Sequence, residues 1–190
     1  KIQVALKFIH PMEGHYMDLA KPKQFGVLHE GNKTDLLPTV VETSGKGGDQ
    51  KKGFTTWKAE YTIKRPGDYT FYMEPTLYWE PAEDCFIQHF TKVVVPAFGE
   101  EEGWDKPLGL KTEIVPLTRP FGNYAGNVFQ GQVLLDGKPV AGAMVEVEFY
   151  NRDGKHEAPS EYMVTQVVKA DEDGVFTYGV PFAGWWGFAA

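Results

Sequence analysis

Short segments in which hydrophobic and polar residues alternate, separated by turn residues, run along the whole chain. The clearest is the segment 54–63, in which Trp57, Ala59 and Tyr61 fall on one face and charged residues on the other. A period of two residues is typical of a half-buried β-strand. No long segment has the 3.6-residue period of an amphipathic helix. The pattern therefore predicts an all-β protein made of antiparallel strands.

In the first half of the chain, strands alternate with turn signals. Glu30-Gly31 and the segment 65–68 supply turn residues. The polar, glycine-rich stretch from about 42 to 53 has no core-forming residue, so we expect an exposed, mobile loop there. The pattern predicts strands over 1–9, 24–29, 54–63, 69–73 and 85–95.

The second half has a cleaner rhythm, with Asp136-Gly137 as a strong hairpin turn. The pattern predicts strands over 110–115, 126–135, 143–150, 164–170, 175–180 and 181–188, the first of which lies in a proline-rich and glycine-rich stretch. We therefore predict two tandem antiparallel β-sandwiches, residues 1–98 and 125–190, joined by a connection over 99–124.

The ends of the chain suggest a trimmed or processed fragment of an exported protein. Lys1 enters a strand pattern at once with no initiating methionine, and the last strand pattern runs up to Ala190. We expect that the second sandwich is cut short at its C-terminus, and that a leader or anchor preceded Lys1.

Composition narrows the classes of partner. The formal net charge of −7 argues against nucleic acid and anionic membranes, because both are bound by basic patches. No apolar run reaches the roughly 20 residues of a membrane span. The one cysteine, Cys85, rules out an intramolecular disulfide. The chain also has no nucleophile elbow, zinc-protease motif or phosphate loop, so we expect a protein that is not an enzyme.

The strongest candidate metal ligands are His10 and His15. They flank Pro11 and Gly14, with Glu13 between them, in a stretch that breaks the strand pattern. Residues five apart in one strand point to opposite faces, so a curled loop is needed to bring both rings together. Imidazole with carboxylate or thiolate support suits Ni²⁺ or Co²⁺, and also Zn²⁺. Met12 and Met17 would add sulfur ligands, which favour Cu⁺. The alternative to a metal site is an ordinary loop with two surface histidines.

A second group of candidate ligands is Glu83, Cys85 and His89, at the start of the strand predicted over 85–95. Four strand residues would separate Cys85 from His89 by about 13 Å at about 3.3 Å per residue, too far for one ion. We therefore expect this stretch to add one or two ligands to the His10–His15 loop. The alternative for Cys85 is a small buried hydrophobic residue, and the alternative for His89 is a half-buried strand histidine. His29 and His156 lie beside turn signals, and we expect both at the surface.

Two further patterns admit a structural explanation. Tyr78, Trp79, Trp104, Trp185 and Trp186 could form a carbohydrate platform, but the two adjacent tryptophans must point to opposite faces of a strand, which favours core packing. The acidic stretch 171–173 could hold calcium, but further oxygen ligands are not identifiable, which favours a solvated turn.

The segments 131–147 and 169–178 resemble the transthyretin-like, or carboxypeptidase-regulatory-like, β-sandwich module. In both segments an Asp-Gly pair supplies the turn between strands, and alternate residues after Gly142 are hydrophobic. Such modules are mostly not enzymes, so this resemblance implies an immunoglobulin-like or transthyretin-like sandwich used for binding or scaffolding.

Taken whole, the chain resembles a more specific family, known as DUF4198 or NikM-like. The resemblance rests on the phrases at 10–17, 21–27, 78–84, 116–120 and 184–190, among them His-Pro-Met-Glu-Gly-His-Tyr-Met and Tyr-Trp-Glu-Pro-Ala-Glu-Asp. It implies the periplasmic component of a cobalt/nickel uptake system, with a divalent metal ion and the membrane components of an importer as partners. The alternative is a structural or interaction module that binds a protein or polysaccharide without metal.

Overall fold

The computed structural model describes residues 1–47 and 51–190, and these fall into two compact units. Among the described residues, unit 1 holds 1–8, 16–46 and 51–103, and unit 2 holds 9–15, 47 and 104–190. Nearly all regular structure is β, as the alternation predicted. Two short 3-10 helices, η1 (Leu37–Thr39) and η2 (Glu161–Met163), are the helical segments of the described chain.

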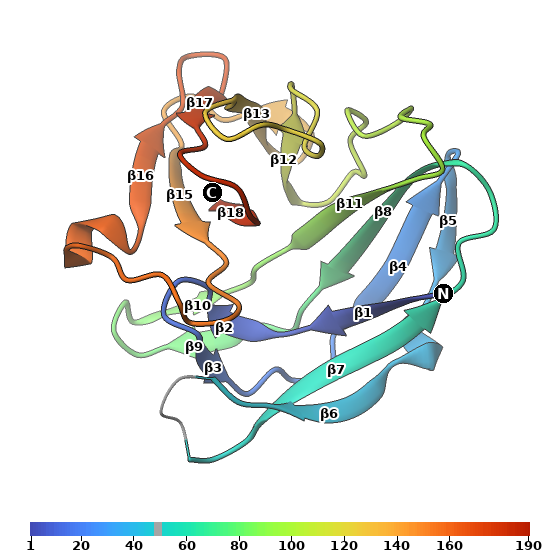
Figure 1. Cartoon of the computed structure of the whole chain (residues 1–190), viewed down its shortest axis with the longest axis horizontal. Helices are drawn as coiled ribbons and strands as arrows, with labels where there is room; N and C mark the ends of the chain where they lie inside the picture. The colour runs from blue at the N-terminus through green and yellow to red at the C-terminus, as the bar shows by residue number, and fades with distance from the viewer. Residues whose placement is uncertain (48–50) are drawn as a thin grey trace. The chain divides into compact units, whose positions relative to one another are not determined.

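Unit 1 is built mainly on two antiparallel sheets, whose strands are labelled in Figure 1. One sheet has the order β11-β8-β4-β5 and the other the order β1-β7-β6. The strands are β1 (Ile2–Leu6), β4 (Gln24–His29), β5 (Asn32–Asp35), β6 (Val41–Gly45), β7 (Phe54–Tyr61), β8 (Gly67–Glu74) and β11 (Thr91–Ala97).

The hydrophobic core of unit 1 joins residues from both sheets. Phe25 and Val27 of β4 are almost fully buried, and they cluster with Leu6 of β1, Ala59 of β7 and Phe71 of β8. Packing of two sheets through such a cluster is the arrangement of a β-sandwich. The predicted inward face of the segment 54–63 is confirmed, because its hydrophobic residues all pack on this cluster.

Two segments of unit 1 differ from the sequence prediction. Val41–Gly45, expected in a loop, forms the edge strand β6, which pairs with β7. An exposed edge strand tolerates polar residues, so hydrophobic alternation could not reveal it. Residues 48–50 of that expected loop lie outside the described residues. The single strand expected over 85–95 is instead two strands, because residues 88–90 leave the first strand, β10 (Cys85–Ile87), before β11 begins.

The start of β8 is fixed by the Tyr69 side chain. Its hydroxyl donates to the Arg65 carbonyl oxygen at 2.9 Å, four residues earlier, across the predicted turn at 65–68. The Tyr69 ring is 2% exposed and stacks on the His29 ring at 3.9 Å between centroids. His29 is therefore buried, and the expectation that it lies at the surface is wrong.

Replacing Tyr69 with phenylalanine is expected to lower the free energy of unfolding of unit 1 by about 1 kcal/mol, the net contribution of a typical hydrogen bond. The ring would keep its packing, so the loss reports the hydroxyl alone. Urea denaturation measures it, with Tyr124→Phe as control because Tyr124 is 84% exposed. Equal stability of the two variants would show that the turn does not depend on this bond.

Unit 2 also has two larger antiparallel sheets. In one, β13 pairs with β12, β14 and β17. The other has the order β16-β15-β18 (Figure 1). The strands are β12 (Thr112–Pro116), β13 (Val128–Leu135), β14 (Lys138–Pro139), β15 (Met144–Phe149), β16 (Gln166–Lys169), β17 (Val175–Gly179) and β18 (Trp186–Ala189).

The core of unit 2 again joins two sheets. Val145 and Val147 of β15 have no exposed surface, and they cluster with Phe129 of β13 and Phe176 of β17. The inward face predicted for the segment 143–150 is thereby confirmed. In the described part of the chain, no helix is long and apolar enough to span a membrane.

The turns predicted in unit 2 are present, and their characteristic residues stabilise the turn conformation. Asp136 and Gly137 both have positive φ, at 49° and 72°, as a two-residue type I′ hairpin requires. In the acidic turn at 171–174, the Asp171 carboxylate accepts hydrogen bonds from the backbone N–H groups of Asp173 and Val175, each at 2.9 Å. Asp171 therefore closes a turn by itself, as the solvated-turn explanation expects.

Candidate metal centre

His10 and His15 flank the turn of a short hairpin. His10 ends β2 (Phe8–His10), His15 begins β3 (His15–Met17), and the two strands pair. Pro11 begins the turn, and Gly14 closes it at φ +66°, donating its N–H to the His10 carbonyl oxygen at 2.9 Å. A glycine suits this position because positive φ is unfavourable for residues with a Cβ.

This hairpin brings the two imidazole rings close together. The ring centroids of His10 and His15 lie 6.3 Å apart with the planes tilted by 51°, and both residues are exposed. A metal ion between the rings would lie about 2.0–2.1 Å from one nitrogen of each. These two bonds, together with the distance from each nitrogen to its ring centroid, can span the separation between the two centroids. The pair could therefore hold one ion with water completing its coordination. Glu13 is also exposed, whereas Met12 is buried at 9% exposure.

The turn that carries these histidines belongs to unit 2, and other residues of unit 2 hold it. The backbone N–H of Asn151 donates to the Pro11 carbonyl oxygen at 3.1 Å, and the Asn151 side-chain amide donates to the Met12 carbonyl oxygen at 3.0 Å. The Met12 N–H donates to the Glu148 carboxylate at 3.3 Å, and Thr165 donates to the same carboxylate. Such anchoring limits the conformations of the turn, so the histidine pair is ordered in advance of any ligand.

The Asn151 side chain is itself fully engaged. It is 8% exposed, and besides Met12 it donates to the His156 carbonyl oxygen at 2.8 Å and accepts from the His156 N–H at 3.1 Å. The His156 ring stacks on Phe182 with centroids 5.2 Å apart. His156 is exposed, as expected, but its backbone helps to hold the residue that anchors the turn.

A second hairpin repeats this design in unit 1. The strands β9 (Tyr78–Glu80) and β10 (Cys85–Ile87) have the same lengths as β2 and β3 and enclose a turn of the same length. Pro81 again begins the turn, and Asp84 closes it with φ +54°. Glu80 and Cys85 are directly opposite each other, at the positions that correspond to His10 and His15. The Phe8 and Tyr78 rings, which begin the two hairpins, are in contact with centroids 5.0 Å apart.

The other candidate ligands lie on or just after this second hairpin. The Cys85 thiol donates to the Glu83 carboxylate at 3.8 Å, and Cys85 is partly exposed. His89 lies beyond the end of β10, where its ring is 6.0 Å from the Phe8 ring. Within the described residues, no three histidine, cysteine, aspartate or glutamate side chains are grouped as metal ligands. Each hairpin thus offers a pair of donors: two imidazoles on one, a thiol and a carboxylate on the other.

Sequence reasoning missed Asn151 and Glu148, which anchor the first turn, and Glu80, which faces Cys85. Asn151 and Glu148 lie more than a hundred residues from the turn, so no local pattern could link them. Glu80 had a local signal, because Pro11-Met-Glu-Gly14 and Pro81-Ala-Glu-Asp84 share their proline and glutamate positions. Comparing those two phrases would have predicted two matched turns.

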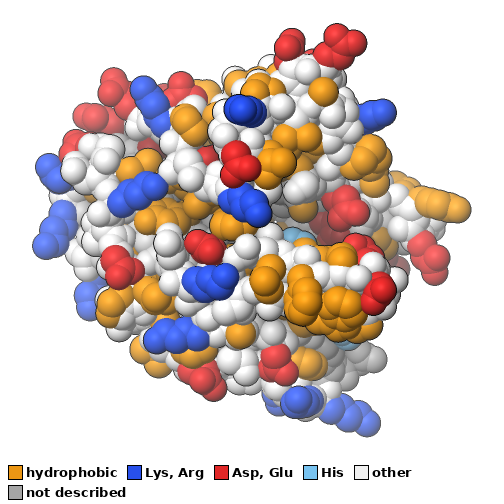
Figure 2. Space-filling model, turned by 180° about the vertical axis from the view of Figure 1, so that it is seen from behind, with side chains coloured by type: hydrophobic (Ala, Val, Ile, Leu, Met, Phe, Trp, Pro, Cys, Tyr) orange, Lys and Arg blue, Asp and Glu red, His pale blue; other side chains and the backbone are white. Residues whose placement is uncertain are grey.

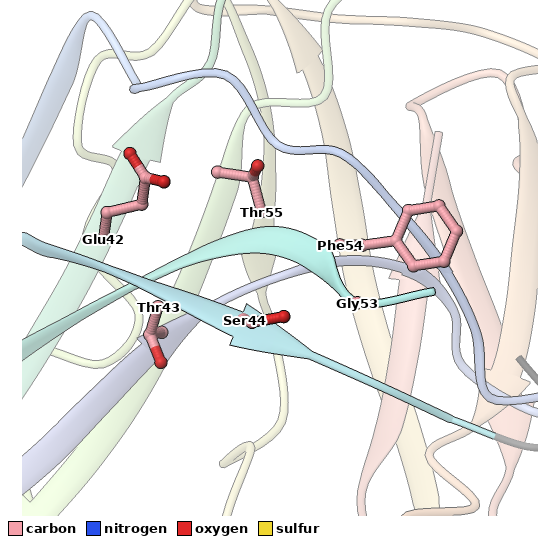
Figure 3. Close-up of a pocket in the computed structure, with 6 residues that line it drawn as sticks. All are labelled: Glu42, Thr43, Ser44, Gly53, Phe54 and Thr55. Carbon is pink, nitrogen blue, oxygen red and sulfur yellow. The ribbon is translucent and has the colours of Figure 1, made fainter. Parts of the chain in front are cut away.

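Two hollows in unit 1 have a different chemistry. One, of about 210 Å³, lies between β6 and β7 and is lined by hydroxyl groups, the Glu42 carboxylate and Phe54, with neither histidine nor cysteine (Figure 3). The other, of about 380 Å³, is lined by His29, Tyr61, Thr62, Lys64, Arg65 and Tyr69. The Lys64 and Arg65 side chains of the second hollow repel a metal ion, and the first hollow has no imidazole or thiol ligand. Neither hollow therefore competes with the hairpin as a site for Ni²⁺ or Co²⁺.

Comparison with curated proteins and with solved structures gave no significant match. A family model, described as a domain of unknown function (DUF4198), matches residues 1–190. The resemblance noted on the phrases of the sequence is thereby confirmed at the level of the family. From its first residue to its last, the chain belongs to the DUF4198 family.

Proposed function

We propose that this protein is an exported, periplasmic accessory protein that binds a divalent metal ion for a nickel/cobalt uptake system, without enzymatic activity. The observation that carries the proposal is the pair of exposed imidazoles of His10 and His15, 6.3 Å apart on a turn that Asn151 and Glu148 hold in place. The partners implied are Ni²⁺ or Co²⁺ and the membrane components of an importer.

The chemistry of the pair favours a borderline metal ion. Two neutral imidazoles suit Ni²⁺, Co²⁺ and Zn²⁺, whereas Cu⁺ prefers the softer sulfur of thioether and thiolate groups. Of the two thioethers beside the pair, Met12 is buried in packing and Met17 is partly buried, which weakens the argument for Cu⁺. Glu13 is exposed on the same turn and offers a carboxylate oxygen. An open site of this kind suits a protein that must pass the ion on, because solvent-exposed ligands release it readily.

Isothermal titration with Ni²⁺, Co²⁺, Zn²⁺ and Cu⁺ tests the proposal. The wild-type chain is expected to bind one equivalent of Ni²⁺ or Co²⁺, and His10→Ala or His15→Ala to weaken this affinity at least about tenfold, because each removes a donor. Binding is also expected to fall as the pH is lowered, since a protonated imidazole cannot coordinate a metal ion.

Two comparisons sharpen this titration. His156→Ala removes an exposed imidazole of unit 2 that is not on the turn, and it should bind metal like the wild type. Cys85→Ser and Glu83→Gln, titrated in parallel, show whether the second hairpin contributes. Undiminished Ni²⁺ affinity in both His10→Ala and His15→Ala would remove this site from consideration.

A further inference from the structure

The second hairpin, β9–β10, exposes a group of large hydrophobic side chains. Exposed hydrophobic side chains occur in groups between charged ones on the surface, as the face in Figure 2 shows. On β9–β10 and just before it, Leu77, Trp79 and Phe86 are exposed at 54%, 45% and 64%. Trp79 and Phe86 are directly opposite each other on the two strands, and their rings meet edge to face with centroids 5.0 Å apart. We call these three residues the aromatic ridge.

The hairpin that carries the aromatic ridge forms a small sheet of its own. Among the described residues, β9 and β10 pair with each other alone, as a sheet of two strands. A two-stranded hairpin is marginally stable in water. The edge-to-face pair of Trp79 and Phe86 contributes about 0.5–1.5 kcal/mol, and it leaves both side chains exposed. Grouped hydrophobic side chains with polar surroundings are typical of interaction sites, and tryptophan is among the residues that dominate the binding energy of interfaces.

The surroundings of the aromatic ridge are acidic. Glu80, Glu83 and Asp84 lie on or beside the hairpin turn, and the segment 66–91 contains no lysine or arginine. Negative charge at the rim of an apolar contact favours a partner with positive charge at the matching positions. It also disfavours an anionic membrane surface, which attracts basic segments.

The shape of the aromatic ridge disfavours a polysaccharide. The Trp79 and Phe86 ring planes are inclined by 65°, so the pair presents an edge rather than one flat platform. A sugar ring stacks best on a flat aromatic face. A protruding edge fits a hollow in a protein surface, where it can be enclosed on both sides.

We propose that the β9–β10 hairpin is a docking element, whose aromatic ridge enters an apolar hollow on a protein partner rimmed by lysine and arginine. Burial of the three side chains supplies the affinity, and the carboxylates of Glu80, Glu83 and Asp84 set the orientation and speed the encounter. This contact does not depend on a metal ion at His10 and His15.

The test uses the full chain and three labelled synthetic peptides of equal length: one of leucine and lysine, one of leucine and glutamate, and one of serine and lysine. Fluorescence anisotropy is expected to show binding of the leucine–lysine peptide, with much weaker binding of the other two. Trp79→Ser combined with Phe86→Ser should raise the Kd at least about tenfold. Tyr162→Ser, which removes a 92% exposed ring of unit 2, should leave the Kd unchanged.

A second variant leaves the rings in place and tests the charges. Glu80→Gln, Glu83→Gln and Asp84→Asn together should weaken binding and abolish most of its dependence on salt concentration, because the screened attraction is gone. The proposal is overturned if the serine substitutions leave the Kd unchanged, or if the neutral triple variant keeps the wild-type salt dependence. Binding of a chitin hexasaccharide that requires Trp79 would also overturn it, in favour of a sugar site.

Discussion

Replacing Asn151 with alanine is expected to lower the free energy of unfolding of unit 2 by about 3 kcal/mol, because each buried backbone group left without its partner costs about 1–3 kcal/mol. The substitution removes the bonds to the Met12 and His156 carbonyl oxygens and the bond from the His156 N–H. It also loosens the turn between the two candidate ligands, although the backbone bond from residue 151 to Pro11 and the Glu148 bond to Met12 remain. If the proposed function is right, Ni²⁺ affinity should fall about 10–100-fold, the usual effect of losing an outer-shell partner.

Urea denaturation, monitored through the hydrogen exchange of the β15 amides, measures the stability of unit 2 separately from that of unit 1. Asn123→Ala is the matched control, since the exposed Asn123 side chain donates one hydrogen bond, to the Arg119 carbonyl oxygen. Asn123→Ala should cost well under 1 kcal/mol. A stability of Asn151→Ala equal to that of the control would contradict the anchoring role, whatever the metal affinity does.

Replacing Gly174 with alanine is expected to destabilise unit 2 by about 3 kcal/mol, through two additive costs. Its φ of +72° costs a residue with a Cβ about 1–2 kcal/mol. An added Cβ would also lie 2.9 Å from the Val140 nitrogen and 3.0 Å from the Val133 oxygen, two backbone atoms that are hydrogen-bonded to each other. Overpacking of this kind typically costs a further 1–3 kcal/mol or so, roughly the cost of inserting an extra methylene into a packed core.

Gly137→Ala separates these two costs. Gly137 has the same φ of +72°, but an added Cβ there would meet no atom within 4 Å. Its substitution should therefore cost about 1–2 kcal/mol, the conformational part alone. The same denaturation experiment compares both variants. If they lose the same stability, the close approach of Gly174 to the β13–β14 hairpin has no energetic consequence.

Local sequence predicted the strands whose two faces differ. The segments 54–63 and 143–150 alternate because one face packs in a core and the other meets solvent, and both inward faces are confirmed. The turns at Glu30-Gly31 and Asp136-Gly137 were also readable, because positive φ at both positions restricts the residues that fit. The all-β class follows from features of this kind, which repeat along the chain, whereas membership of the DUF4198 family rests on the match of the whole chain to the family model.

Prediction from the sequence failed for features that depend on residues far along the chain or on backbone hydrogen bonds. Apart from Val41, which is exposed, β6 is made of polar residues and a glycine, so hydrogen bonds to β7 define it and no hydrophobic pattern does. At the break between β10 and β11, the Gln88 side-chain amide donates to the Pro75 carbonyl oxygen at 2.7 Å. His29 is buried because Tyr69, forty residues later, covers its ring. Each of these features is set by contacts between distant residues.

The candidate site shows the same division. The sequence by itself determined that two imidazoles flank a proline-and-glycine turn, and that the chain alternates into antiparallel strands, because turn chemistry and a period of two residues are local properties. Only the tertiary structure decided that the turn makes a hairpin, that Asn151 and Glu148 hold it, and that Trp79 and Phe86 meet on an exposed ridge. Those features arise from hydrogen bonds and packing between segments that fold together, and such contacts leave no mark on neighbouring residues.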